Sequence, residues 1–183
     1  MLRESEVALS LAEAELGLVR GARSLRGHMK KVSLPPLTPS LASKILGIWM
    51  LKSREDVDAG GQILIDPFLG RDPIGILCFG PSHFAAQFMK RDRSDEESVP
   101  QRVQAKNNTA AVNGYDAYFG IYSVDEAAGT LATQVEGSIS PVNIGKTYVR
   151  DVRVVGNELL IQLKTTSVDG VAITRTNTFY RIG

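Results

Sequence analysis

The sequence has few of the residues on which covalent and metal-dependent chemistry depends. Its 183 residues include one cysteine, Cys78, and two histidines, His28 and His83. A lone cysteine forms no disulfide within the chain, and neither histidine has cysteine or carboxylate companions at metal-ligand spacing. Cys78 lies in the apolar run GILCF, which is typical of a buried, inert thiol. We therefore expect no metal site and no cysteine nucleophile.

Motifs for cofactors and phosphate groups are also missing. The chain has no Gly-x-Ser-x-Gly, no phosphate-binding glycine loop and no dinucleotide fingerprint, and its GRDPIG, residues 70 to 75, has the wrong spacing for each. We therefore expect no cofactor. Covalent catalysis and phosphoryl transfer are disfavoured for the same reason.

Neither charge nor hydrophobicity is concentrated along the chain. Lys and Arg number 21 against 20 Asp and Glu, a net charge of +1, so no basic surface for nucleic acid is expected. No run of about 18 apolar residues occurs, so we expect no membrane span and no membrane partner. The N-terminal MLRESEVALSLAEAELG carries acids where a secretory signal has an apolar core, which predicts a cytoplasmic location.

The chain divides at the proline cluster SLPPLTPS, residues 33 to 40. Upstream, apolar residues recur at steps of three and four, the spacing of an amphipathic helix. They are Val7, Leu11, Ala14, Leu18, Ala22, Leu25 and Met29. A break near Gly21 is expected, so two helical segments are as probable as one. We predict one domain of residues 1–39, the helix with its proline-rich connector, and a second of residues 40–183.

The second domain has the pattern of an all-β protein. After a short helix LASKIL capped by Ser40, alternating side chains predict nine strands. These cover residues 47–54, 62–68, 73–79, 83–89, 115–124, 130–138, 146–154, 158–165 and 172–182. Short, turn-rich connections indicate that neighbouring strands are antiparallel. A meander of this many strands exposes two edge strands unless it closes into a barrel. We predict a closed up-and-down barrel. The polar stretch 90–114 is either a flap over its mouth or, more commonly for such stretches, a solvated connection.

Four stretches of this domain resemble the bacterial lipocalin-like domain family. They are Gly47-Ile48-Trp49, GRDPIGILCFGPSHFAAQFMKR, GYDAYFGIYSVDEAAGTLATQVEGS and the final FYRI, within residues 44 to 182. The resemblance implies a lipocalin-like antiparallel barrel of eight or nine strands. It also implies that Trp49 packs over the closed end beneath an arginine of the last strand, for which Arg181 is the match. Trp49 is thus first of all an anchor.

The sequence departs from the family pattern at two places. Thr133 and Gln134 stand where many members have a pair of histidines, and Asn143 stands where a tryptophan is frequent. We therefore expect the pocket to be reshaped there.

Polar side chains that face the barrel interior are the candidates for a site. On strand 115–124, Tyr118, Gly120 and Tyr122 share one face and Tyr115, Ala117, Phe119 and Ile121 the other. Either face could line a cavity, and the space at Gly120 favours the first. The candidate catalytic residues are Tyr118, Tyr122, Gln87 and Gln134. The candidate substrate contacts are Trp49, Phe84, Phe119, Glu136, Tyr180 and, from the N-terminal helix, Leu11 and Leu18.

Two classes of function fit a barrel that holds one small apolar ligand. One is a carrier for a small hydrophobic metabolite. The other is an enzyme that works by shape, because lipocalin-like proteins include spirotetramate- and spirotetronate-forming cyclases of bacterial polyketide pathways. That resemblance implies a cofactor-independent cyclase that catalyses an intramolecular Diels-Alder reaction on a polyene polyketide substrate. Such a cycloaddition needs orientation rather than a nucleophile. The N-terminal helix is then a lid or, with nearly equal weight, a homodimer element or a tail.

Overall fold

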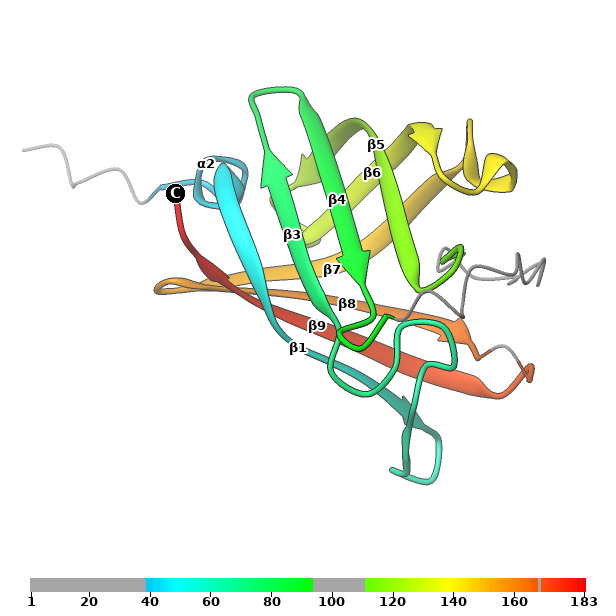
Figure 1. Ribbon diagram of the computed structural model, residues 1–183. Helices are drawn as coiled ribbons and strands as arrows, with labels where there is room; N and C mark the ends of the chain where they lie inside the picture. Colours follow the sequence, from blue (N-terminus) through cyan, green and yellow to red (C-terminus); the bar gives the residue numbers. More distant parts are fainter. Residues whose placement is uncertain (1–38, 94–110, 168) are drawn as a thin grey trace, which may run out of the picture. The chain divides into compact units, whose positions relative to one another are not determined.

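The computed structural model describes residues 39–93, 111–167 and 169–183 (Figure 1). The predicted N-terminal helix and most of stretch 90–114 lie outside these residues. The described residues form helix α2 (Leu41–Ile45), the short helix η2 (Pro141–Asn143) and nine strands. The strands are β1 (Gly47–Asp58), β2 (Ile63–Leu64), β3 (Ile74–Phe79), β4 (His83–Met89), β5 (Tyr115–Asp125), β6 (Thr130–Ser138), β7 (Thr147–Val155), β8 (Glu158–Thr166) and β9 (Ala172–Arg181). Neither described helix is long and apolar enough to cross a membrane.

Eight of the strands close into an antiparallel barrel. The order is β1-β3-β4-β5-β6-β7-β8-β9, and β9 pairs back onto β1 from Trp49↔Arg181 to Asp58↔Ile173. Closure gives every long strand two neighbours and removes the edges that an open meander would expose. The all-β, up-and-down barrel predicted from the alternation is confirmed.

The strand predicted at 62–68 is much shorter than expected. Only Ile63 and Leu64 pair, with Val57 and Asp56 at the end of β1, so β2 is an extra strand beside the barrel. The cause lies in the next residues. Asp66 Oδ1 accepts hydrogen bonds from the backbone N–H groups of Phe68, at 2.9 Å, and Leu69, at 3.2 Å, which turns the chain. Pro67 has no N–H to donate to a ladder.

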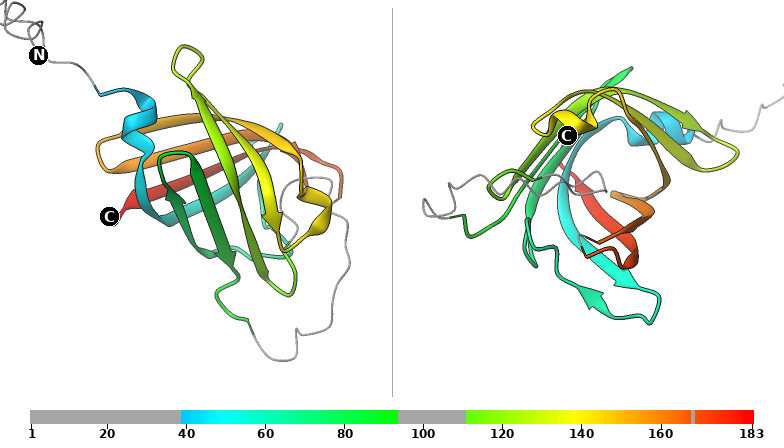
Figure 2. Two further views of the ribbon diagram at one scale, coloured as in Figure 1. Left: turned by 90° about the horizontal axis from the view of Figure 1, so that it is seen from above. Right: turned by 90° about the vertical axis from the view of Figure 1, so that its right-hand side faces the viewer.

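The up-and-down topology places alternate connections at opposite ends of the barrel (Figure 2), and the two ends differ in the length of these connections. The closed end carries α2, the C-terminus and the tight turns after β3, β5 and β7. The other end, called the mouth here, carries the longer connections β1–β3, β4–β5, β6–β7 and β8–β9. The closed end is therefore joined by short turns, and the mouth is built of longer connections.

Trp49 seals the closed end. Its side chain is fully buried, and its indole N–H donates to the Ile45 carbonyl at 2.8 Å. The Arg181 guanidinium lies 4.1 Å from the indole centroid and donates to the carbonyls of Leu46 and Lys44, each at 2.5 Å. Helix α2, which Ser40 caps as predicted, supplies Lys44 and Ile45. The stacking predicted for Trp49 and Arg181 is confirmed, and such a contact is worth about 0.5 to 2 kcal/mol.

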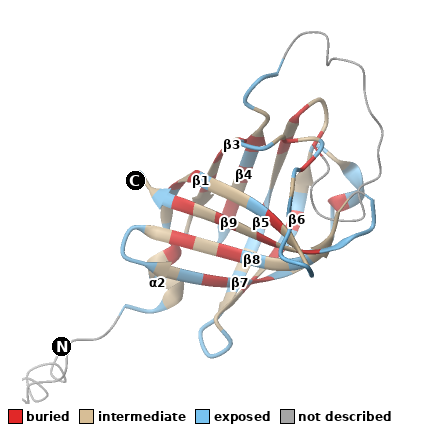
Figure 3. Ribbon diagram, turned by 90° about the horizontal axis from the view of Figure 1, so that it is seen from below, coloured by how far each residue is buried: buried red, intermediate tan, exposed pale blue. Residues whose placement is uncertain are grey.

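A β-bulge in β1 changes which side chains face the interior. The pairing with β9 shifts between Leu51 and Ser53, so β1 has one residue more than its partner. Strict alternation from Trp49 would place Leu51 and Ser53 on the same face, and the bulge makes this wrong beyond Leu51. After the bulge the inward positions are Arg54 and Asp56, whose side chains are each 6% exposed. The alternation of buried and more exposed residues along the strands is visible in Figure 3.

Gly120 serves strand packing rather than ligand space. The β5–β6 register shifts between Phe119 and Gly120, and a Cβ added at Gly120 would collide with the backbone carbonyl oxygen of Gln134. The glycine thus lets β6 approach closely at this bulge. The space that we expected there is filled by β6, although the predicted face of β5 does point inward.

Candidate ligand-binding site

The barrel encloses a small cavity between its core and its mouth. Its volume of about 30 Å³ leaves room for about two water molecules. The apolar part of the lining is Leu77, Phe79, Phe84, Phe88, Leu131, Ile161, Leu163 and Phe179. The polar part is Arg54, Asp116, Tyr118, Thr133, Arg150, Arg175 and Asn177. The cavity therefore has an apolar, largely aromatic wall and a wall of hydrogen-bonding and charged groups.

Tyr118 joins the two walls. Its ring packs edge-on against Phe84, with centroids 5.9 Å apart, and is stacked with Phe88 at 6.4 Å. Its hydroxyl makes no hydrogen bond to any described residue. Burial raises the pKa of this phenol, so it stays protonated and able to donate.

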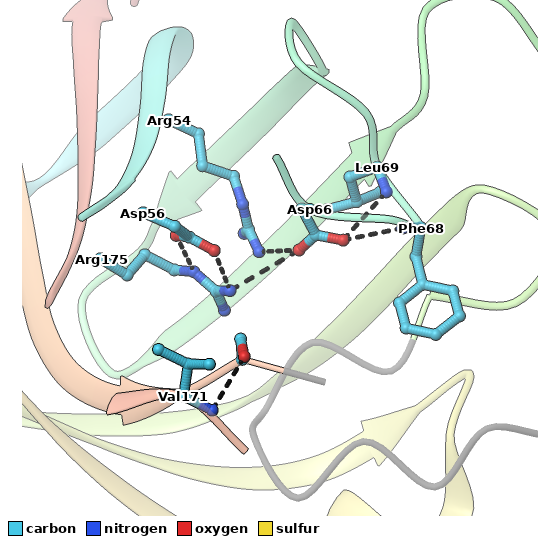
Figure 4. A network of polar contacts seen from close by, with 8 residues as sticks. Arg54, Asp56, Asp66, Phe68, Leu69, Val171 and Arg175 are labelled. Atoms are coloured by element: carbon cyan, nitrogen blue, oxygen red, sulfur yellow. Dashed lines mark hydrogen bonds and ion pairs between the residues drawn. The ribbon is translucent and has the colours of Figure 1, made fainter. Parts of the chain in front are cut away.

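Four charged side chains form a buried ion-pair network on the polar wall (Figure 4). Arg175 binds Asp56 through two contacts, Nε to Oδ1 at 2.7 Å and Nη2 to Oδ2 at 2.6 Å. Arg54 Nη2 lies 2.5 Å from Asp66 Oδ2, which is also 3.6 Å from Arg175 Nη2. Burial alone would raise the pKa of Asp66, but the two guanidinium groups and two backbone amides hold it below its ordinary value. The network thus fixes the β1–β3 connection to the barrel wall.

Asp116 on β5 is a buried carboxyl group of a different kind. It is 2% exposed, and its Oδ1 has no hydrogen-bond partner among the described residues. Burial raises the pKa of Asp116 to about 7, with Asp66 adding to the shift while Arg54 and Arg175 oppose it. This carboxyl group therefore titrates near neutral pH rather than in acid.

Arg150 on β7 is held by neutral groups. Its Nη1 donates to Thr133 Oγ1 at 2.5 Å and makes a longer hydrogen bond of 3.5 Å to the Tyr148 carbonyl. The guanidinium lies 5.3 Å from the centroid of the Tyr148 ring. Its Nη2 is buried without a partner among the described residues, as is Asn177 Oδ1. Burial lowers the pKa of Arg150, although arginine stays charged in proteins.

The two departures from the family pattern lie beside this wall. Thr133 supplies the hydroxyl that accepts from Arg150. Asn143, in η2, accepts a hydrogen bond from the Tyr148 hydroxyl at 2.9 Å. Both residues therefore support the polar wall on which Arg150 lies.

Some of the predicted site residues face the interior. Tyr118 and Phe84 line the cavity. Tyr122 is partly buried on the same face of β5, but its hydroxyl donates to the Gly80 carbonyl at 2.6 Å, at the closed end. Trp49 lies beneath Arg181 as an anchor and does not line the cavity.

The other predicted site residues do not reach the cavity. Gln87, Gln134, Glu136, Phe119 and Tyr180 lie on the outer face of the barrel. Gln87 Oε1 there accepts from the Tyr115 hydroxyl at 2.7 Å, and Phe119 is 54% exposed. Their placement differs from the interior role that we expected for them. Leu11 and Leu18 lie outside the described residues.

The main polar residues of the cavity were missed in the sequence. The sequence contained a signal for three of them, because side chains two positions apart in a strand share a face. Asp116 lies two positions before Tyr118, and Arg175 and Asn177 lie four and two positions before Phe179. Arg54 gave no such signal, because the bulge in β1 interrupts the alternation.

A family model described as a lipocalin-like domain matches residues 46–178. No curated protein matches the chain. Within the described ranges, no three His, Cys, Asp or Glu side chains gather in a way that could hold a metal ion.

Proposed function

The chain belongs to the lipocalin-like domain family, and on this premise we propose that its barrel binds an amphiphilic small molecule and acts on it as a cofactor-independent cyclase. The proposed reaction is an intramolecular, spiro-ring-forming Diels-Alder cycloaddition on a polyene polyketide. The observation that carries the proposal is the division of the cavity into an aromatic wall and a hydrogen-bonding wall.

Such a division suits a substrate with an apolar chain and a polar carbonyl head. Aromatic rings bury the chain, and the polar groups fix the orientation of the head. Holding diene and dienophile in contact contributes at most about 7 to 11 kcal/mol to lowering the barrier. The reaction converts three π bonds into two σ bonds and one new π bond, moves no proton and leaves the mass unchanged.

Tyr118 is the proposed hydrogen-bond donor to the dienophile carbonyl. It lies between the two walls, and its hydroxyl is not used by any described residue. One such hydrogen bond in a buried site contributes roughly 1 to 3 kcal/mol to stabilising charge that develops on the oxygen. Tyr122 is less suited to this role, because its hydroxyl donates to Gly80.

Binding of a polyene requires the interior to widen. The cavity of about 30 Å³ is far smaller than such a molecule. The β1–β3 connection is fixed by Asp66 and by the fully buried Leu69, so widening on this side would have to break the contacts of Asp66 with Arg54 and Arg175. In this proposal the N-terminal segment, residues 1–39, serves as the lid, and its competing role is a homodimer element.

The test is incubation of the full chain with a linear polyene that carries an internal dienophile, followed by chromatography and mass spectrometry. A cyclase yields an isomer of unchanged mass faster than the buffer control. Tight binding without conversion would overturn the cyclase and establish the carrier.

The Y118F variant sharpens this test. Loss of the proposed donor should lower kcat about 5- to 100-fold with little change in KM, since the hydrogen bond strengthens in the transition state. Y115F is the matched control, because it removes a tyrosine hydroxyl from the outer face of the same strand. Equal rates for Y118F and Y115F would remove Tyr118 from the mechanism.

A further inference from the structure

The polar wall of the cavity contains three guanidinium groups, and they are neutralised unequally. Arg175 faces Asp56 and Asp66, and Arg54 faces Asp66. Arg150 faces a threonine hydroxyl, a backbone carbonyl and a tyrosine ring, and no described carboxylate lies within ion-pair distance of it. The surplus positive charge of the wall is therefore on Arg150.

An isolated buried charge is costly unless another group compensates it. Arg150 is 7% exposed, lines the cavity and keeps Nη2 without a hydrogen-bond partner among the described residues. Thr133 holds the guanidinium through Nη1, so the second arm of the fork stays available. A planar guanidinium in this state suits a delocalised oxyanion better than a neutral oxygen.

We propose that Arg150 binds an anionic oxygen of the ligand, so that the barrel selects molecules with an acidic head, a carboxylate or an enolate, over neutral ones of the same shape. This inference rests on the proposed function only in taking the cavity as the ligand site. Arg150 acts here as a specificity-determining residue, and its role does not depend on the chemical step.

Asp116 makes the selection dependent on pH. The groups that act on its carboxyl are Arg54 on β1, Asp66 in the β1–β3 connection and Arg175 on β9, while Tyr118 of β5 and Arg150 of β7 line the same cavity. Protonated Asp116 carries no charge and can donate to the ligand, whereas ionised Asp116 repels an anion in the same cavity. Because its pKa is about 7, acids should bind more weakly as the pH rises through 7.

The test uses the full chain and two fluorescent polyenes of nearly equal shape, cis-parinaric acid and its methyl ester. At pH 6.5 the acid should bind about 10-fold more tightly than the ester, the ratio expected for one charge-assisted hydrogen bond. Equal affinities in the unaltered protein would overturn the inference without any variant.

Two substitutions locate the effect. R150Q should weaken binding of the acid about 10-fold and leave binding of the ester within about twofold. R153Q is the control, because Arg153 lies on the same strand with its side chain exposed, and it should change neither affinity. R150K, which keeps the charge but loses the fork, should retain part of the preference and also serves if R150Q fails to fold. An unchanged acid preference in R150Q, or in R150K where R150Q does not fold, would assign the selection to other groups.

The pH arm tests Asp116 separately. In the unaltered protein the affinity for the acid should fall between pH 6 and 8, and D116N should abolish this fall. The same dependence of affinity on pH in both proteins would overturn the role of Asp116. Acid-selective binding without turnover would overturn the cyclase alone. Turnover with equal affinity for acid and ester would overturn this inference alone.

Discussion

The closed end and the mouth half of the barrel each place a guanidinium over an aromatic ring, yet the two arginines are satisfied to different degrees. Arg181 covers Trp49 at 4.1 Å and donates to two backbone carbonyls. Arg150 covers Tyr148 at 5.3 Å and leaves Nη2 without a partner among the described residues. A group whose hydrogen bonds are complete contributes stability, whereas one that is incomplete in a cavity is available to a ligand. The closed end is therefore the scaffold, and the mouth half of the barrel contains the candidate site.

The largest effect is expected from removing the anchor of the closed end. W49A should lower the free energy of unfolding by about 3 to 5 kcal/mol, because a large, fully buried side chain leaves a cavity. Urea unfolding followed by circular dichroism measures this change. The folded fraction should keep its turnover, since Trp49 does not line the cavity. Loss of turnover at full stability would place Trp49 in the site instead.

Breaking the ion-pair network should have the next largest effect. D66N removes the charge that faces Arg54 and leaves a buried guanidinium, at a cost of about 3 kcal/mol. Because the pKa of Asp66 is below its ordinary value, this stabilisation exists above the unfolded-state value near 3.8 and is lost as the pH falls through the folded-state value. The difference in urea midpoint between D66N and the unaltered chain should therefore be large at pH 7 and shrink under strong acid. An equal difference at pH 7 and pH 2 would contradict this account.

Asp116 should show the opposite pH dependence. Its pKa rises from 3.8 to about 7 on folding, so between these values the native state holds a proton that the unfolded state has lost. Stability therefore falls as the pH rises from about 4 to 7 and levels off above that. D116N should be more stable than the unaltered chain at pH 8, on the order of 4 kcal/mol, and the gain should vanish near pH 4. A gain independent of pH would show that burial of an uncharged group is responsible.

The smallest effect on stability is expected from the N-terminal segment. If residues 1–31 close over the mouth, L11D or L18D should lower turnover strongly and leave the barrel's melting temperature unchanged, because each charge lies on the apolar face of the predicted helix. Proteases should cut the segment in the free protein and spare it when product is bound. Size-exclusion chromatography is the control: a variant that keeps its turnover but changes from dimer to monomer would make the helix an assembly element.

The sequence predicts the barrel well because strand alternation and turn chemistry are local. The eight barrel strands lie within a few residues of their expected positions, and the Trp49–Arg181 contact follows from its family resemblance. Ion pairs between residues far apart in the chain cannot be predicted in this way, because neither segment carries a local signal for the other. Asp56 and Arg175 are 119 positions apart, and nothing in either segment indicates the other.

The two predicted glutamines lie at positions that strict alternation places on the outer face of the barrel. Gln87 follows Ala86 and precedes Phe88, both buried, so its own strand places it outside. Gln134 stands next to buried Val135 and Thr133 and is placed outside for the same reason. Applied strictly, the period of two would have excluded both and retained Asp116. Only Arg54 required knowledge of the bulge.

The bulge in β1 also makes one place in the barrel tolerant of a change in chain length. Lys52 is the residue for which β9 has no counterpart, so its deletion leaves Leu51, Arg54 and Asp56 opposite their present partners. The deletion costs an exposed ion pair with Glu158, worth about 0 to 1 kcal/mol, and some of the local bend. A deletion further along β1 would instead turn Asp56 outward and leave Arg175 without its bidentate partner. Related barrels can therefore gain or lose a residue at this point while inheriting the same interior.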